Sequence, residues 1–210
     1  MVACAPGHSN PGRWRAPLHV ARVAAAADPE EVSMADPVRT DHVRFEPLAE
    51  AHLDAMARMA LDPDVQRFTR VPVPPPPDFA RTWLGRYEAG RRDGTREGFA
   101  VLDAGDGSFL GLAAVPKIDR DAKTAELGYL VAPEARGRGV ATAALWLLTR
   151  WALDELGAVR LELLISVDNE ASKRVAKRCG YKFEGVLRSL HVKQDIRQDT
   201  EMWSRLAGEA

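Results

Sequence analysis

Two arginines alternate with two glycines in the segment Arg136-Gly137-Arg138-Gly139. The apolar run before this segment is typical of a buried strand, and the long apolar stretch after it is typical of a helix. The first N–H groups of a helix lack intrahelical acceptors, and the helix dipole adds positive potential there. Glycine lets a bulky anion approach the backbone closely. The segment therefore predicts an anion site, to which both arginines add charge.

Other phosphate-binding loops fit this segment less well. A Walker A loop ends in Gly-Lys-Ser/Thr, whereas this one continues Gly139-Val140-Ala141. A dinucleotide-binding loop has a third Gly or Ala where Thr142 stands. The alternative to an anion site is a surface turn whose arginines are solvated and have no binding role. The strand before the loop and the helix after it favour the anion site.

A carboxylate, Glu126, interrupts the apolar run before the loop. Charge inside a sheet is costly, so this residue calls for an explanation. Burial would raise the pKa of Glu126 toward the range useful for a general base that acts through water. Alternatively, Glu126 pairs with an arginine or reaches solvent at a face of the sheet. The sequence leaves both interpretations open.

Asn169 and Ser172 begin a short helical segment that ends near Cys179, with Gly180 as its left-handed cap. Asn at such a position caps free N–H groups whether or not the helix has a further role. Cys179 lies at an apolar helix end with no obvious base beside it, which argues against a nucleophile. The five histidines form no cluster with ligand spacing, so no metal site is predicted.

Hydrophobic periodicity places these residues on alternating strands and helices. Strands are predicted at 42–47, 98–103, 109–115, 125–131, 160–167, 181–193 and 199–206. Helices are predicted at 48–61, 79–92, from the anion loop through Trp151, and at 168–179, with a short helical turn opening at Asp62. Residues 71–77 are rich in proline and predict a stiff, exposed connection.

The overall composition is that of one soluble globular domain with an appendage. The chain has 210 residues, of which 46% are apolar and 28% charged. Its net charge of −1 gives no basic field for nucleic acid. The two cysteines, Cys4 and Cys179, do not make a disulfide framework, and no apolar run is long enough to span a membrane. A cytoplasmic protein without membrane or nucleic-acid partners is expected.

Residues 1–37 are predicted to be a disordered extension, with the domain at 38–206 and a tail at 207–210. Residues 1–33 lack the apolar core of a secretory signal. An alternative is that they are upstream sequence ahead of a true start at Met34.

The spacing Arg136-x-x-Gly139-x-Ala141 resembles the acyl-CoA signature of the GCN5-related N-acetyltransferases, and the resemblance spans residues 38–206. The sequences from Ala125 to Tyr129, at Asn169-x-x-Ser172 and around Cys179-Gly180 resemble the branch that includes the ribosomal-protein alanine acetyltransferases. The resemblance implies an α/β (α+β) fold: a mixed, mostly antiparallel sheet of about seven strands, with helices on both faces and splayed central strands.

The resemblance also implies roles for individual residues. Glu126 matches a glutamate that some members use as base. Ser172 matches a serine proposed as the acid for the leaving thiolate, because Ala176 stands where many members have a tyrosine. The cofactor-binding residues implied are Tyr129, Leu130 and Val131 for pantetheine, Asn169 for the coenzyme arm, and Arg136, Gly137, Arg138, Gly139, Val140, Ala141 and Thr142 for the pyrophosphate.

The function expected is transfer of an acetyl group from acetyl-CoA to a primary amine, of a protein N-terminus or a small molecule, in a ternary complex. One alternative is an acyl-CoA-binding module without turnover, which the missing tyrosine at Ala176 favours. Another is a different donor, such as succinyl-CoA. The protein is expected to be a monomer or homodimer. The acceptor wall is expected from the helices within 48–87, the proline-rich loop and the final hairpin.

Overall fold

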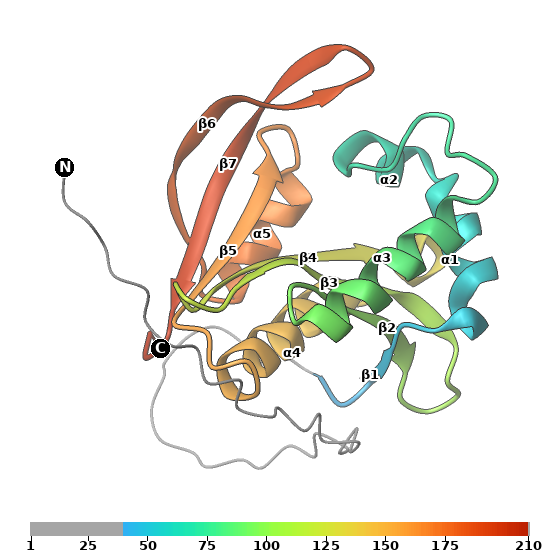
Figure 1. The fold of residues 1–210 in the computed structure, drawn as a ribbon, viewed down its shortest axis with the longest axis horizontal. Helices are drawn as coiled ribbons and strands as arrows, with labels where there is room; N and C mark the ends of the chain where they lie inside the picture. The colour runs from blue at the N-terminus through green and yellow to red at the C-terminus, as the bar shows by residue number, and fades with distance from the viewer. Residues whose placement is uncertain (1–39, 210) are drawn as a thin grey trace, which may run out of the picture.

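A computed structural model describes residues 40–209, and the extension predicted for residues 1–37 lies outside this range. Seven strands form one sheet in the order β1-β2-β3-β4-β5-β7-β6 (Figure 1). Neighbouring strands pair antiparallel except for the parallel pair β4 and β5, so the predicted fold class is confirmed. The strands are β1 Val43–Pro47, β2 Glu97–Asp103, β3 Phe109–Asp119, β4 Thr124–Val131, β5 Arg160–Ser166, β6 Lys182–Lys193 and β7 Ile196–Leu206.

Helices cover both faces of the sheet, and each face has its own apolar core. On one face, Met56, Leu84 and Leu112 belong to a cluster built from α1, α2, α3 and the strands beneath them. On the other, Leu145, Leu148 and neighbouring residues of α4 pack on the central strands. The helices are α1 Leu53–Ala60, α2 Pro63–Phe68, α3 Phe79–Asp93, α4 Val140–Asp154 and α5 Glu170–Arg178, with 3₁₀ turns at Glu50–His52 and Pro133–Ala135.

Two local predictions are corrected. The helix predicted from Leu48 begins at Leu53, because the Leu48 N–H still donates to Gly98 O of β2 at 3.0 Å. Residues 194–197 lack the Asp-Gly pair common at such hairpins and predict a looser turn, yet β6 and β7 pair up to Lys193 and Ile196. Gln194 and Asp195 make this tight turn by adopting positive φ angles of 48° and 63°. Such angles match the twist of two-residue hairpins, and Asp is among the residues that tolerate them.

The parallel pair β4 and β5 is short, and this shapes the centre of the molecule. Only residues Thr124–Glu126 pair with Arg160–Glu162. Among residues 40–209, the rest of β4 beyond Glu126 pairs only with β3, and the rest of β5 pairs only with β7. The two strands therefore diverge, and β5, β6 and β7 rise away from β4 (Figure 1). None of the helices within residues 40–209 combines the length and apolar character needed to cross a bilayer.

Candidate active site

The divergence of β4 and β5 leaves two strand edges facing each other without a partner. Gly128 to Val131 pair with β3 on their other edge, from Ala114 to Gly111. Leu163 to Ser166 pair with β7 on theirs. Unpaired strand edges present backbone N–H and C=O groups that can bind an extended ligand containing amides. The predicted pantetheine contacts Tyr129, Leu130 and Val131 all lie on the free edge of β4.

The predicted anion loop connects β4 to α4, and its backbone is open. Gly137 and Gly139 have φ angles of +74° and +81°, and a Cβ added to either would meet no atom within 4 Å. Helix α4 begins at Val140, and the Ala143 N–H is the first to reach a backbone acceptor, Gly139 O at 3.0 Å. Within residues 40–209, the amides of 137–142 donate to no protein acceptor. These amides are therefore available to an anion.

The two arginines of the loop have different surroundings. Arg136 forms ion pairs with Asp62, at the N-terminus of α2, and with Asp64. Burial acts to raise the pKa of Asp62, but hydrogen bonds from Arg136 and from the Val65 N–H outweigh it and lower this pKa. The charge of Arg136 therefore ties the loop to α2. Arg138 forms one longer ion pair, with its Nη2 3.7 Å from Asp103 Oδ2, and at 55% exposure it is the arginine with more room to turn toward a bound anion.

Glu126 is the last residue of β4 that pairs with β5, and its side chain is 18% exposed. Arg70, which follows α2, donates from Nη2 to Glu126 Oε1 at 3.3 Å. The same Nη2 lies 3.4 Å from His191 Nε2 of β6. The ion pair that the sequence left open as an alternative is thus present. Glu126 itself lies at the point where β4 and β5 diverge.

Ser172 lies on the opposite side of β4, in the first turn of α5. Its Oγ is 2.8 Å from the Tyr129 hydroxyl, and its N–H donates to Asn169 Oδ1 at 3.0 Å. Burial raises the pKa of Tyr129 above its ordinary value, so this hydroxyl stays protonated and able to donate. Asn169 thus acts as the N-cap, and Ser172 is held beside the free edge of β4.

Ala176 and Cys179 do not supply a proton carrier at the end of α5. Ala176, at the position of the common tyrosine, is fully buried. Cys179 is also buried, its Sγ donates to Thr142 O at 3.5 Å, and burial raises the pKa of its thiol to about 12. A thiol in this state is a poor nucleophile. Within residues 40–209, no group of three or more His, Cys, Asp or Glu is arranged to hold a metal ion.

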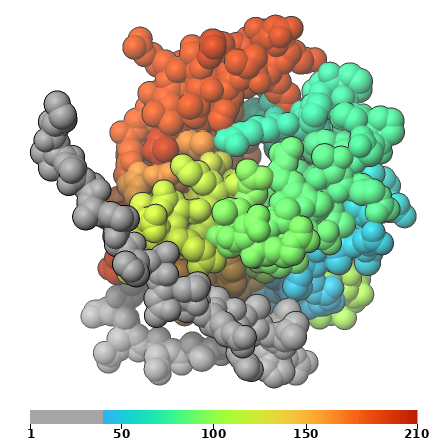
Figure 2. Space-filling view, viewed as in Figure 1, coloured from blue at the N-terminus to red at the C-terminus, as the bar shows by residue number. Residues whose placement is uncertain are grey.

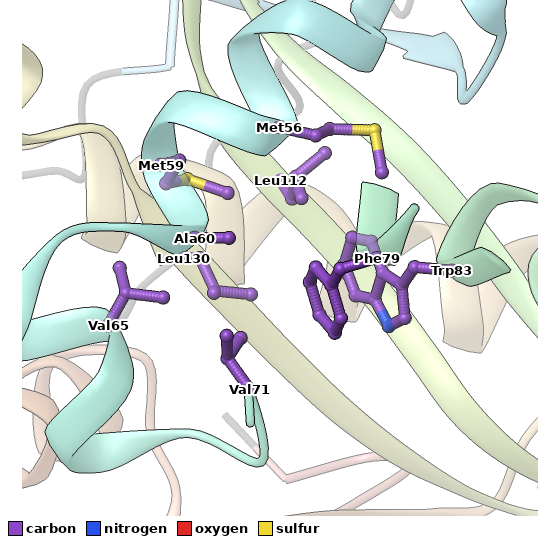
Figure 3. A pocket seen from close by; sticks show the side chains of 9 residues that line it. All are labelled: Met56, Met59, Ala60, Val65, Val71, Phe79, Trp83, Leu112 and Leu130. Atoms are coloured by element: carbon purple, nitrogen blue, oxygen red, sulfur yellow. The ribbon is translucent and has the colours of Figure 1, made fainter. Parts of the chain in front are cut away.

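An apolar cavity of about 20 Å³ lies on the Glu126 side of β4 (Figure 3). Leu130 of β4 lines it, together with side chains of α1, α2, α3 and the loop between α2 and α3. The close-up shows Phe79 and Trp83 on one side and Met56 and Met59 on another. The lining has no charged side chain, so this cavity suits an apolar group. Its residues are Met56, Met59, Ala60, Val65, Val71, Phe79, Trp83, Leu112 and Leu130.

The structure therefore brings the predicted residues Glu126 and Ser172 close to β4, but on opposite faces of this strand. Glu126 lies on the side of α3, and Ser172 on the side of α5. Two contacts were missed from the sequence: Arg70 on Glu126, and the Tyr129 hydroxyl on Ser172. Arg70 is 56 residues from its partner, and no local pattern marks it. The sequence offers one signal for the second contact: side chains alternate between the two faces of β4, and Ser172 lies early in its helix.

Comparison with known proteins agrees with this geometry. Residues 42–182, more than half of the chain, match the model of the acetyltransferase (GNAT) domain. The chain belongs to this family. It is 34% identical, over 104 residues, to YdaF of Bacillus subtilis (strain 168), which is provisionally named a ribosomal N-acetyltransferase. That match covers 50% of this chain and 57% of YdaF.

Two further similar proteins are also named for ribosomal-protein substrates. The ribosomal-protein-serine acetyltransferase of Escherichia coli (strain K12) is 29% identical, over 47% of this chain and 55% of its own. Among solved structures, RimL, a ribosomal L7/L12 alpha-N-protein acetyltransferase in complex with coenzyme A, superposes with a TM-score of 0.74 at 20% identity. The superposition covers 83% of this chain and 98% of RimL. This structural likeness shows the fold.

Proposed function

We propose that this protein is an N-acetyltransferase that transfers the acetyl group of acetyl-CoA to a primary amine, of a protein N-terminus or a small molecule. One observation carries the proposal: β4 loses its β5 partner after Glu126, and an open glycine loop with unpaired amides follows the same strand. A CoA thioester needs both features, an edge for its amide-bearing arm and a helix start for its diphosphate.

The donor would lie along the free edge of β4 and on the amides of 137–142. Main-chain groups of Tyr129, Leu130 and Val131 would pair with the pantetheine arm, and one N–H there would polarise the acyl carbonyl. Asn169, already the N-cap of α5, has its amide N–H groups left for the coenzyme arm. The apolar cavity beside Leu130 offers no partner to a second carboxylate, which favours acetyl over succinyl as the acyl group.

Transfer would proceed directly from thioester to amine. Glu126 would accept, through water, the proton that the amine loses as its nitrogen bonds to the acyl carbon. The C–S bond breaks, and Ser172 would give its proton to the leaving thiolate while the Tyr129 hydroxyl donates a hydrogen bond to the serine oxygen. Solvent water would return a proton to Ser172 as the products leave. No covalent enzyme intermediate is needed, and the state of the Cys179 thiol argues against one. A cytoplasmic location and a monomer or homodimer belong to the same proposal.

The names of the relatives support an amine acceptor but include two kinds. Ribosomal proteins are named for some, and spermidine is named for an Escherichia coli (strain K12) relative that is 29% identical over 39% of this chain. The chain spans 57% of YdaF, 55% of the serine acetyltransferase and 44% of the spermidine acetyltransferase. Protein N-termini and polyamines are therefore both acceptors to test.

Titration calorimetry with acetyl-CoA and thiol release with a panel of amines test the proposal. Glu126→Gln should lower kcat by about 10²-fold or more while the Kd for acetyl-CoA stays within about twofold, because only the proton acceptor is lost. Glu162→Gln is the matched control, since Glu162 faces Glu126 in register and also pairs with an arginine, Arg160. It should retain wild-type kcat.

Three results would contradict parts of the proposal. Absence of binding at millimolar acetyl-CoA would end it. Binding without thiol release from any amine would instead identify a binding module. Unchanged turnover of Glu126→Gln would remove Glu126 as the base and leave the transferase assignment intact.

A further inference from the structure

The carboxylate of Glu126 is occupied by a cation that belongs to the protein itself. Arg70 Nη2 lies 3.3 Å from Glu126 Oε1, while the Arg70 side chain is 61% exposed and that of Glu126 only 18%. An amine that reaches Glu126 from the side of α3, directly or through one bridging water, therefore competes with Arg70 for the carboxylate. The guanidinium has solvent-exposed space into which it can turn, so the exchange requires no rearrangement of the core.

The β6–β7 hairpin holds the Arg70 segment over the site. Lys193 Nζ donates to Thr69 O at 2.6 Å, and Arg70 contacts His191 of the same hairpin. Burial, and then the charge of Arg70, lower the pKa of His191, so its ring is neutral near pH 7 and accepts the hydrogen bond from the guanidinium. The space-filling view shows the segment after α2 reaching the hairpin (Figure 2). Arg70 displaced from Glu126 thus stays at the acceptor entrance.

Several cationic side chains lie near this entrance. The buried hydroxyl of Tyr87 on α3 lies within electrostatic range of Arg70, Arg86 and Arg96, and of one acid, Glu126. Lys117 of β3 is paired in register with Glu126 and so shares its face of the sheet. Lys193 adds a further ammonium from the hairpin. A polyamine would bring several positive charges into this group, and like charges brought together cost binding free energy.

We propose that Arg70 is the specificity-determining residue of the acceptor site and selects acceptors that carry an anionic group close to the reactive amine. The inference rests on the proposed function and names the acceptor chemistry. When the amine, or the water that bridges it to Glu126, takes the place of Arg70, the released guanidinium pairs with the anion of the acceptor. The ion pair between Arg70 and Glu126 is then replaced by an ion pair between Arg70 and the acceptor.

The geometry limits where that anion lies on a peptide. Because the guanidinium starts within hydrogen-bonding distance of Glu126, the anion must lie within about one or two residues of the amine, each about 3.8 Å along the chain. An acidic side chain at the second or third residue of a protein N-terminus meets this condition. The α-amine also has an ordinary pKa near 8, against about 10.4 for an alkylamine, so it loses its proton more readily.

Two amidated peptides that differ only by Asp or Asn at the second residue test the inference. The wild-type kcat/KM should be about tenfold higher for the Asp peptide, the ratio expected for one charge-assisted hydrogen-bonded pair, and spermidine should be the poorest acceptor. Arg70→Gln should reduce the ratio to about one. Arg81→Ala removes a comparably exposed arginine of an ion pair on α3, with Glu50, and should keep the wild-type ratio.

Equilibrium binding separates failure of this inference from failure of the transferase assignment. The same peptides are titrated into wild type and Arg70→Gln saturated with coenzyme A. Tighter binding of the Asp peptide that depends on Arg70 supports the inference even if no acceptor is turned over. Equal affinities and equal kcat/KM for both peptides in the wild type, or a preference that survives Arg70→Gln, would overturn it while any measured turnover leaves the transferase standing.

Discussion

At the scale of single residues, the hydroxyl of Ser172 is the most precisely positioned candidate. The Tyr129 hydroxyl lies 2.8 Å from it, and Asn169 fixes the first turn of its helix. If Ser172 protonates the leaving thiolate, Ser172→Ala should lower kcat by about 10²-fold, with little change in the Kd for acetyl-CoA. Tyr129→Phe should have a smaller effect because Ser172 remains. Steady-state thiol release measures both.

A second pair of hydroxyls elsewhere in the structure provides a matched control for Ser172 and Tyr129. Thr149 Oγ1 of α4 and Tyr181 OH, from the residue just before β6, form a second buried pair with the same separation of 2.8 Å. Tyr181→Phe removes an equivalent hydrogen bond away from the free edge of β4. It should cost stability and leave kcat unchanged. A loss of kcat in Tyr181→Phe equal to that in Tyr129→Phe would show that the Tyr129 effect is structural.

At the scale of elements, the start of α4 should determine donor binding. Gly139 is the N-cap of α4 at φ +81°, and a side chain there would project into the open space above the loop. Gly139→Val should weaken binding of coenzyme A at least about 100-fold, because the side chain excludes the diphosphate and strains the loop. Calorimetric titration gives the Kd directly.

A control variant at Gly157, beyond the other end of the same helix, distinguishes backbone strain from steric blocking of the anion site. Its φ is +67°, and an added Cβ would again meet no atom within 4 Å. Gly157→Val therefore carries a similar backbone penalty at a site with no anion. It should lower the melting temperature but not the affinity for coenzyme A. Equal loss of affinity in the two variants would count against the anion site.

At the scale of the whole molecule, Arg160 and Glu184 join the part of the sheet that diverges from β4. Arg160 of β5 donates two hydrogen bonds to Glu184 of β6, at 2.8 and 2.6 Å, and Ser204 of β7 donates a third at 2.6 Å. Hydrogen bonding to Arg160 has the largest effect on the Glu184 carboxyl, and the bond from Ser204 comes next. Together they lower the pKa of Glu184 from 4.5 to about 2. The network thus holds three strands together at one point.

A lowered pKa in the folded state makes this contribution dependent on pH. It is present above about pH 4.5 and is lost as the pH falls toward 2, because the unfolded chain takes up the proton first. The Glu184 side chain is 40% exposed, so screening limits the effect to about 1 kcal/mol. Urea unfolding between pH 2 and 6 should show a flatter pH dependence for Glu184→Gln than for wild type. Glu50→Gln, in an exposed pair, should retain the wild-type slope.

The sequence by itself determined the local features of this protein. The strand, glycine loop and helix around Gly139 were legible because period, composition and glycine conformation are properties of short segments. The same holds for all seven strands and for Asn169 as the N-cap of α5. The position of Glu126 in its strand also followed from local pattern, as did the expectation that a charge there needs an explanation.

Only the tertiary structure decided which polar groups meet. Arg136 pairs with Asp62 and Asp64, more than 70 residues away, instead of contributing its charge freely to the anion loop. Arg70 covers Glu126, and the Tyr129 hydroxyl reaches Ser172. Such partners are set by strand register, by how the helices pack on the sheet, and by the divergence of β4 from β5. These are long-range properties, and no short segment of the chain contains them.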